Sequence, residues 1–137
     1  MVARNLKPVR DIKLDKYFSK LNDDSFNGKI RATPYWGIPS VAPHGCNGGL
    51  EDDHAPPASY EESKGEVSII IHQYLLARSA PKYVVLYLLH HECLHQVYEP
   101  EDGDPHGPLF REQEVLIPNR DKAIGWLKKS GFSTVDW

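Results

Sequence analysis

The stretch "PKYVVLYLLHHECLHQVY" (residues 81–98) decides the fold of this chain. It is apolar almost all round over residues 84–89, a pattern typical of a helix buried in a core. Pro81 suits the first helical position, and Pro100 prevents continuation. We therefore expect a buried helix that begins at Pro81 or just before it and ends at Tyr98, with the other elements packed around it.

Upstream of this helix the sequence predicts one helix and two strands. Apolar residues spaced i, i+3, i+4, i+7 favour an amphipathic helix over residues 11–22, which "NDDSFNG" then ends. The segment 29–36, "KIRATPYW", reads as a strand, and Pro34 indicates a position at the edge of the sheet. "GEVSIII", residues 65–71, predicts a second strand that is largely buried.

The rest of the chain alternates loops with short helices. Residues 37–65 are dense in Pro, Gly and acidic side chains, and we expect a long loop there that is either functional or mobile, with a short strand near Leu50. After a turn-rich loop over residues 99–105, we expect a short helix within 106–118, entered through Pro108, and a last helix over 119–131 with Asn119 as N-cap. The fold class is therefore α+β.

Length and composition restrict the kind of protein. A chain of 137 residues predicts one domain, residues 1–137, and a composition that is 26% charged is typical of a globular protein. No apolar run approaches the roughly 20 residues of a membrane span, so we expect a cytoplasmic protein without membrane contact. The net charge of −3 argues against strong intrinsic nucleic-acid affinity, although Lys and Arg gather near both ends. Oligomeric state has no signal in the sequence.

The central helix carries an H-E-x-x-H pattern, His91-Glu92-Cys93-Leu94-His95. Residues four apart share one face of a helix, so His91 and His95 can direct two imidazole nitrogens at one ion. With only two cysteines in the chain, any metal must rely on histidine, and Zn²⁺ suits such ligands. Glu92 lies beside this pair without sharing its line, which suits a general base that takes a proton from a zinc-activated water.

A catalytic zinc site needs a third protein ligand. His106 is our preferred candidate because the turn-rich loop before it can bring the chain back over His91 and His95. Glu112 or Glu114 on the following helix could serve instead, although acidic residues in "FREQE" are most simply a solvated helix face.

Other chemistry-bearing residues receive simpler interpretations. His90 faces about 100° away from His91 and suits a supporting or surface position, and Cys93 suits a packed core thiol. Tyr60, His72 and Tyr98 could each polarise a substrate carbonyl, but we expect packing roles for them.

Taken together, "LLHHECLHQVYEPEDGDPHGPLF" resembles the catalytic segment of SprT-like metallopeptidases, in which a helical H-E-x-x-H is followed by a loop, His-Gly and a nearby Phe. "YFSKLNDDSFNGKIRATPYW" is similar to the opening of that family, and "GEVSIII" to the strand before its active-site helix. The resemblance covers most of residues 14–110.

This resemblance implies a zincin-like fold, a small twisted mixed sheet packed against the active-site helix and flanking helices. It also implies that His91, His95 and His106 bind zinc and that Glu92 is the general base. Some relatives cleave proteins crosslinked to DNA. This chain lacks the four-cysteine zinc ribbon that often accompanies the domain, which weakens the expectation of a DNA link.

Three functional hypotheses follow. The leading one is a zinc-dependent endopeptidase whose protein or peptide substrate lies beside an exposed edge strand near Trp36 or Leu50. The second is a catalytically silent metal-binding or adaptor module of the same fold. The third is a DNA-associated protease that acts on DNA-bound proteins and is recruited through the basic ends of the chain.

Overall fold

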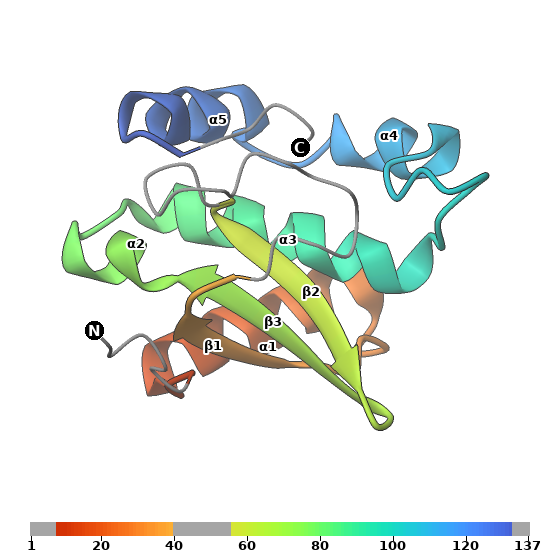
Figure 1. Cartoon of the computed structure of the whole chain (residues 1–137), viewed down its shortest axis with the longest axis horizontal. Helices are drawn as coiled ribbons and strands as arrows, with labels where there is room; N and C mark the ends of the chain where they lie inside the picture. Colours follow the sequence, from red (N-terminus) through yellow and green to blue (C-terminus); the bar gives the residue numbers. More distant parts are fainter. Residues whose placement is uncertain (1–7, 40–55, 133–137) are drawn as a thin grey trace.

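The fold is α+β, as the sequence predicts. The computed structural model describes residues 8–39 and 56–132 (Figure 1). In chain order the elements of these residues are α1 (Ile12–Phe26), β1 (Thr33–Gly37), β2 (Ala58–Ser63), β3 (Glu66–His72), α2 (Gln73–Ala77), α3 (Lys82–Val97), α4 (Pro108–Glu114) and α5 (Arg120–Lys129).

The three strands form one small mixed sheet in the order β1-β3-β2. β3 is central, pairing in parallel with β1 and antiparallel with β2. Pro34 lies in β1, at an edge as predicted, where its missing N–H leaves no gap in the ladder. On the outer side of β1, Val9 and Trp36 exchange backbone hydrogen bonds of 2.8 and 2.9 Å. The expected substrate edge near Trp36 is therefore already paired, whereas β2 pairs only with β3 among the described residues.

Helix α3 lies at the centre of the molecule, with the sheet on one side and α4 and α5 on another (Figure 1). It contacts the neighbouring strands and helices, and most of its side chains from Val84 to Leu94 are buried. The helix is one residue shorter at each end than predicted, because Pro81 is its N-cap and not its first residue, and Tyr98 is its C-cap. A helix apolar on nearly every face therefore becomes the structural axis of the fold.

Helix α1 begins as predicted, because the Asp11 side chain accepts a hydrogen bond from the Lys13 N–H. It ends four residues later than predicted, at Phe26. The Asn22 amide does not break the helix because it is engaged elsewhere, exchanging two hydrogen bonds with the backbone of Ile30 at 2.9 and 3.0 Å. The helix stops at Asn27, which adopts a left-handed conformation with φ 54°.

The first predicted strand is shorter than expected, because residues 29–32 are not part of the sheet. The Gln96 side chain instead bonds both the N–H and the carbonyl of Arg31, at 2.8 and 2.9 Å. This side chain ties the segment before β1 to the last turn of α3.

Two elements were not predicted, β2 and the five-residue helix α2. β2 lies inside the stretch expected to be a loop, because pairing with β3 outweighs its polar sequence "ASYEES". The strand expected near Leu50 lies outside the described residues. Asn119 is the N-cap of α5, as predicted, although its backbone is left-handed and its side chain makes no capping hydrogen bond. Among the described residues, none of the helices has the length and apolarity needed to cross a membrane.

Candidate metal centre

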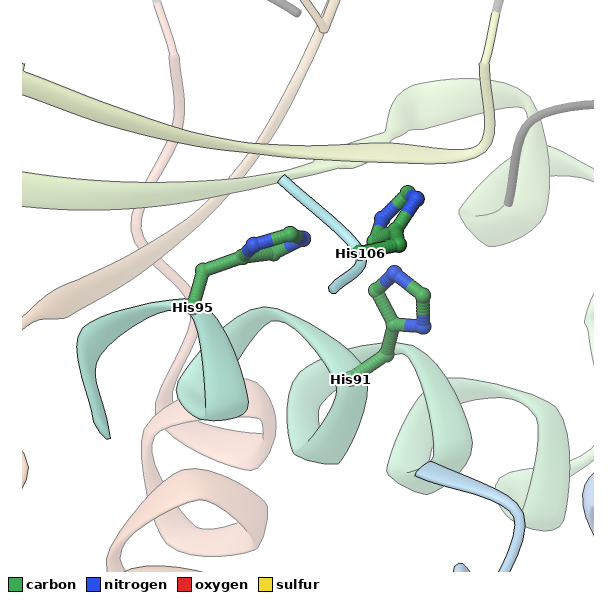
Figure 2. A group of neighbouring side chains, drawn as sticks. All are labelled: His91, His95 and His106. Atoms are coloured by element: carbon green, nitrogen blue, oxygen red, sulfur yellow. The ribbon is translucent and has the colours of Figure 1, made fainter. Parts of the chain in front are cut away.

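Three histidines from two separate segments meet at one point. His91 and His95 project from successive turns of α3, and His106 approaches from the segment before α4 (Figure 2). One ring nitrogen from each lies within 4.8 Å of the others, and the ring centroids are 5.0–5.3 Å apart. His91 is fully buried, whereas His95 and His106 are half-buried, so the group is open on one side.

A tight turn brings His106 back over α3. Asp102 and Gly103 both have positive φ, 53° and 82°, and the flanking residues Glu101 and Asp104 exchange two backbone hydrogen bonds. This Asp-Gly pair is the sequence preferred where two consecutive residues need φ > 0. Asp104 Oδ1 then accepts a hydrogen bond of 2.9 Å from the His106 N–H.

Gly107 leaves room for the side chain of Glu101, which closes this loop. A Cβ atom at this position would lie 2.8 Å from Glu101 Oε2 and 3.0 Å from Glu101 Cβ. The same Oε2 accepts a 3.4 Å hydrogen bond from the N–H of Leu109, in the first turn of α4. The His-Gly pair thus places a potential ligand beside a residue that must lack a side chain.

Phe110 forms an apolar support beneath the three histidines. Its ring is 1% exposed, and its centroid lies 5.1, 4.5 and 4.9 Å from those of His91, His95 and His106. Each imidazole therefore contacts the same buried ring, which restricts the rotamers that the histidines can adopt.

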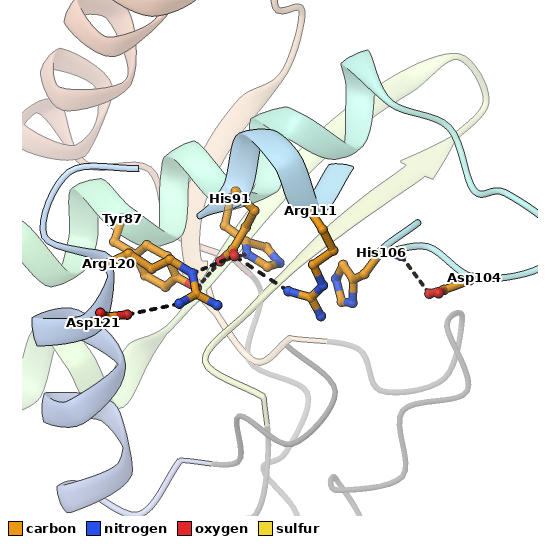
Figure 3. A network of polar contacts seen from close by, with 8 residues as sticks. Tyr87, His91, Asp104, His106, Arg111, Arg120 and Asp121 are labelled. Carbon is orange, nitrogen blue, oxygen red and sulfur yellow. Dashed lines mark hydrogen bonds and ion pairs between the residues drawn. The ribbon is translucent and has the colours of Figure 1, made fainter. Parts of the chain in front are cut away.

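The buried Glu114 links His91 to Arg120 of α5. Figure 3 shows its partners Tyr87, His91, Arg111 and Arg120. Its Oε2 accepts a 2.6 Å hydrogen bond from the Tyr87 hydroxyl and lies 3.3 Å from His91 Nδ1. Its Oε1 accepts a 2.6 Å hydrogen bond from Arg120 Nε, and Arg111 approaches to 3.6 Å. Because Nδ1 is engaged by a carboxylate, the nitrogen that His91 offers to a metal is Nε2.

The electrostatics of this network keep Glu114 ionised and His91 neutral. Burial alone would raise the pKa of Glu114, but hydrogen bonds from His91, Tyr87 and Arg120 outweigh it and lower the pKa to about 2. Burial lowers the pKa of His91, with Glu114 opposing that shift. A neutral imidazole beside a carboxylate is the protonation state that binds a metal ion.

Glu92 is 1% exposed on α3, immediately after His91. Burial raises the pKa of its carboxyl well above the usual value, and the negative charge of Glu61 on β2 adds to the effect. A raised pKa makes the ionised carboxylate a stronger proton acceptor, as a general base requires.

The remaining candidates lie outside the histidine group. His90 packs edge-on against Phe26, with ring centroids 5.2 Å apart, and burial lowers its pKa to about 4. The Cys93 thiol is fully buried in the core, as expected. His72 caps α2 by accepting a hydrogen bond from the Tyr74 N–H.

The two tyrosines considered as substrate contacts differ in position. Tyr98 is the C-cap residue of α3 and packs against the core. Tyr60 on β2 lies closer to the site, its ring centroid 6.2 Å from that of His95, and Gln96 Nε2 donates to its hydroxyl at 3.3 Å.

Sequence reasoning missed the part played by Glu114. We expected a solvated acidic face on α4, which holds for the exposed Glu112 but not for the fully buried Glu114. The available signal was the spacing, because Glu114 follows Phe110 by four residues and so shares its buried face. Glu114 is not part of the group of three histidines that could hold a metal ion, and its Oε2 lies against His91 Nδ1 instead.

The donor set fits a metal ion. Three imidazole nitrogens bound to one zinc would lie roughly 3.4 Å apart at normal bond lengths, so a small inward movement from the observed spacing suffices. The Glu114–His91 contact is the supporting interaction that histidine ligands usually have. These three histidines could therefore hold a metal ion. Comparison with family models, curated proteins and solved structures finds no match to this chain.

Proposed function

We propose that this protein is a zinc-dependent metallopeptidase that hydrolyses peptide bonds, with His91, His95 and His106 as zinc ligands and Glu92 as general base. The observation that carries the proposal is the convergence of three histidines from two segments beside a buried glutamate of the same H-E-x-x-H helix. Imidazole ligands also suit copper, nickel or iron, but the three-histidine set with an open side fits a hydrolytic zinc site best.

The arrangement of elements supports a zincin-like assignment, and with it the resemblance to SprT-like peptidases. A small mixed sheet packs against the helix that carries both motif histidines, and the third histidine returns from a loop after that helix. These are the features that the resemblance implies.

The proposed reaction assigns a task to each residue. When bound, zinc would act as a Lewis acid toward the scissile carbonyl and the attacking water. Glu92 removes one proton from that water as its oxygen bonds to the carbonyl carbon, then delivers the proton to the nitrogen as the C–N bond breaks. The second water proton leaves the new carboxylic acid and is taken up by the amine, so the products are a carboxylate and an ammonium group. Glu114 holds His91 in one tautomer throughout.

The sheet offers a place for the substrate backbone. β2 lies against α3 and brings Tyr60 beside His95, and it is an edge strand that pairs with no described strand other than β3. An extended peptide could pair with this strand and pass its scissile bond over the histidines. β2 therefore replaces Trp36 and Leu50 as our proposed substrate edge.

Metal content tests the first half of the proposal. We expect about one zinc per purified chain by elemental mass spectrometry, with occupancy lost in His95→Ala and His106→Ala. The matched control is His90→Ala, which removes a neighbouring imidazole that is not part of the group and should retain zinc. A chain that binds no zinc after reconstitution would refute the site.

Cleavage of a fluorescently labelled unfolded protein tests the second half. Glu92→Gln should retain zinc and lose about 10²–10⁴-fold of the activity. Glu112→Gln, an exposed change on α4, should leave the rate unchanged. Full activity in Glu92→Gln would contradict the assigned base, and zinc binding without cleavage in the unaltered chain would identify a silent metal-binding module instead.

A further inference from the structure

A second hollow, separate from the histidine group, lies between α1, α3 and the turn that joins α4 to α5. It encloses about 300 Å³. Its walls are mainly apolar and aromatic, with Tyr17 and Leu21 from α1, Leu86 and Tyr87 from α3, and Ile117 from the turn. None of the three histidines lines it. Its volume is at the small end of the range for small-molecule sites.

The rim of this hollow is basic. Lys16 and Lys20 of α1 and Lys82 of α3 all line it with exposed side chains. Asp24 is the one acidic residue of the lining, and it is already engaged by Lys20 at 3.0 Å. Lys82 Nζ lies 5.3 Å from the centre of the Tyr17 ring, directly over the aromatic wall. The positive charges of Lys16 and Lys82 can therefore interact with a molecule bound in the hollow.

The start of α3 adds to this positive field. Lys82 is the first residue of this 16-residue helix, whose N-terminal end carries a partial positive charge. An occupant with one negative group could meet Lys16 and Lys82 at the rim while its apolar part contacts the rings and leucines below. A neutral apolar molecule would gain the burial but leave the lysines without a role.

We infer that this hollow is a binding site for a small amphipathic anion, a carboxylate attached to one ring or a short acyl chain. The inference does not depend on the proposed peptidase activity. Tyr87 is the point of contact between the two sites, because its ring lines the hollow while its hydroxyl donates to Glu114.

Octanoate is a suitable probe, with 1-octanol as the neutral control and acetate as the control without an apolar body. In ¹⁵N-labelled, zinc-loaded protein we expect saturable chemical-shift changes at residues of α1 and α3 that line the hollow. Octanol should bind at least about fivefold more weakly than octanoate, because exposed charge pairs each contribute modestly. Acetate should produce no saturable change there.

Two sets of variants make the test specific. The double variant Lys16→Gln/Lys82→Gln should bind octanoate about fivefold more weakly. Both lysines are exposed, so the fold should be unchanged. The matched pair Lys128→Gln with Lys129→Gln, exposed on α5 and outside the lining, should leave it unchanged. Leu86→Trp, which fills the hollow, should abolish binding, provided its spectrum remains that of the folded chain.

The inference is overturned by any of three results. These are no saturable octanoate binding, equal affinity for octanoate and octanol, or shifts confined to His91, His95 and His106, which would place the carboxylate on the metal. If Leu86→Trp does not fold, the lysine variants decide the outcome by themselves.

Discussion

Glu114 Oε2 lies 3.3 Å from His91 Nδ1, and both side chains are fully buried although they are 23 residues apart. The carboxylate fixes which nitrogen of His91 faces the other two histidines. It also connects the candidate metal centre to Tyr87 and Arg120, so a change on α4 or α5 can alter a ligand on α3.

Glu114→Gln should weaken zinc binding about 10- to 100-fold, because the amide supports the His91 imidazole less strongly than a carboxylate does. The measurement is a competition titration with a chelator of known affinity, on samples whose circular dichroism matches that of the unaltered chain. Glu112→Gln, on the same helix but exposed, is the control and should keep the original affinity. Equal affinities in both variants would remove Glu114 from the support of the site.

Arg120 should stabilise the fold more than Arg111 does, although both face the same Glu114 oxygen. Arg120 Nε lies at 2.6 Å with its side chain 26% exposed, whereas Arg111 lies at 3.6 Å and is 38% exposed. We expect Arg120→Met to lower the free energy of unfolding by about 2 kcal/mol, since a buried carboxylate loses the closer of its two arginine partners. Arg111→Met should cost at most about 0.5 kcal/mol.

Urea unfolding in the presence of a chelator measures both variants without a contribution from bound metal. If both variants lose the same free energy of unfolding, the shorter contact between Arg120 and Glu114 stabilises the fold no more than the longer one does.

The sequence was most informative where structure is local. The run from Pro81 to Tyr98 contains its own helical pattern and boundaries, so α3 and the shared face of His91 and His95 could be predicted. The approach of His106 could be anticipated from the turn residues before it, because Asp-Gly favours the two positive φ values that the loop adopts.

Contacts between distant segments were harder to predict. β2 is held by its ladder with β3, a partner that its own polar residues do not reveal. The burial of Glu114 depends on Tyr87 and Arg120, which come from two other helices. The segment that begins at Asn22 favours an end of α1, but the Asn22 side-chain amide forms hydrogen bonds with the backbone of Ile30, and the helix continues. In each case a tertiary partner outweighs the local preference.

Zinc should stabilise the folded protein, because the three histidines converge only in the fold. At a free zinc concentration about 100 times the dissociation constant, the gain is about 2.7 kcal/mol, or roughly 8 °C in melting temperature for a chain of this size. Differential scanning fluorimetry with and without a chelator measures the shift. In His106→Ala the chelator should have little effect, and an unchanged melting temperature in the parent chain would count against a bound metal.

Two glycine substitutions should act in opposite directions. Gly107→Ala brings a Cβ to 3.0 Å from Glu101 Cβ, so the loop that carries His106 must shift, at a cost of about 1 kcal/mol, and zinc affinity should fall with it. Gly125→Ala lies within α5, has no neighbour within 4 Å of the new Cβ, and should stabilise the helix by about 0.5–1 kcal/mol. Urea unfolding and zinc titration of both variants test the pair. A stable Gly107→Ala protein with normal zinc affinity would mean that the Glu101 side chain moves aside freely. The position of His106 would then not require a glycine at residue 107.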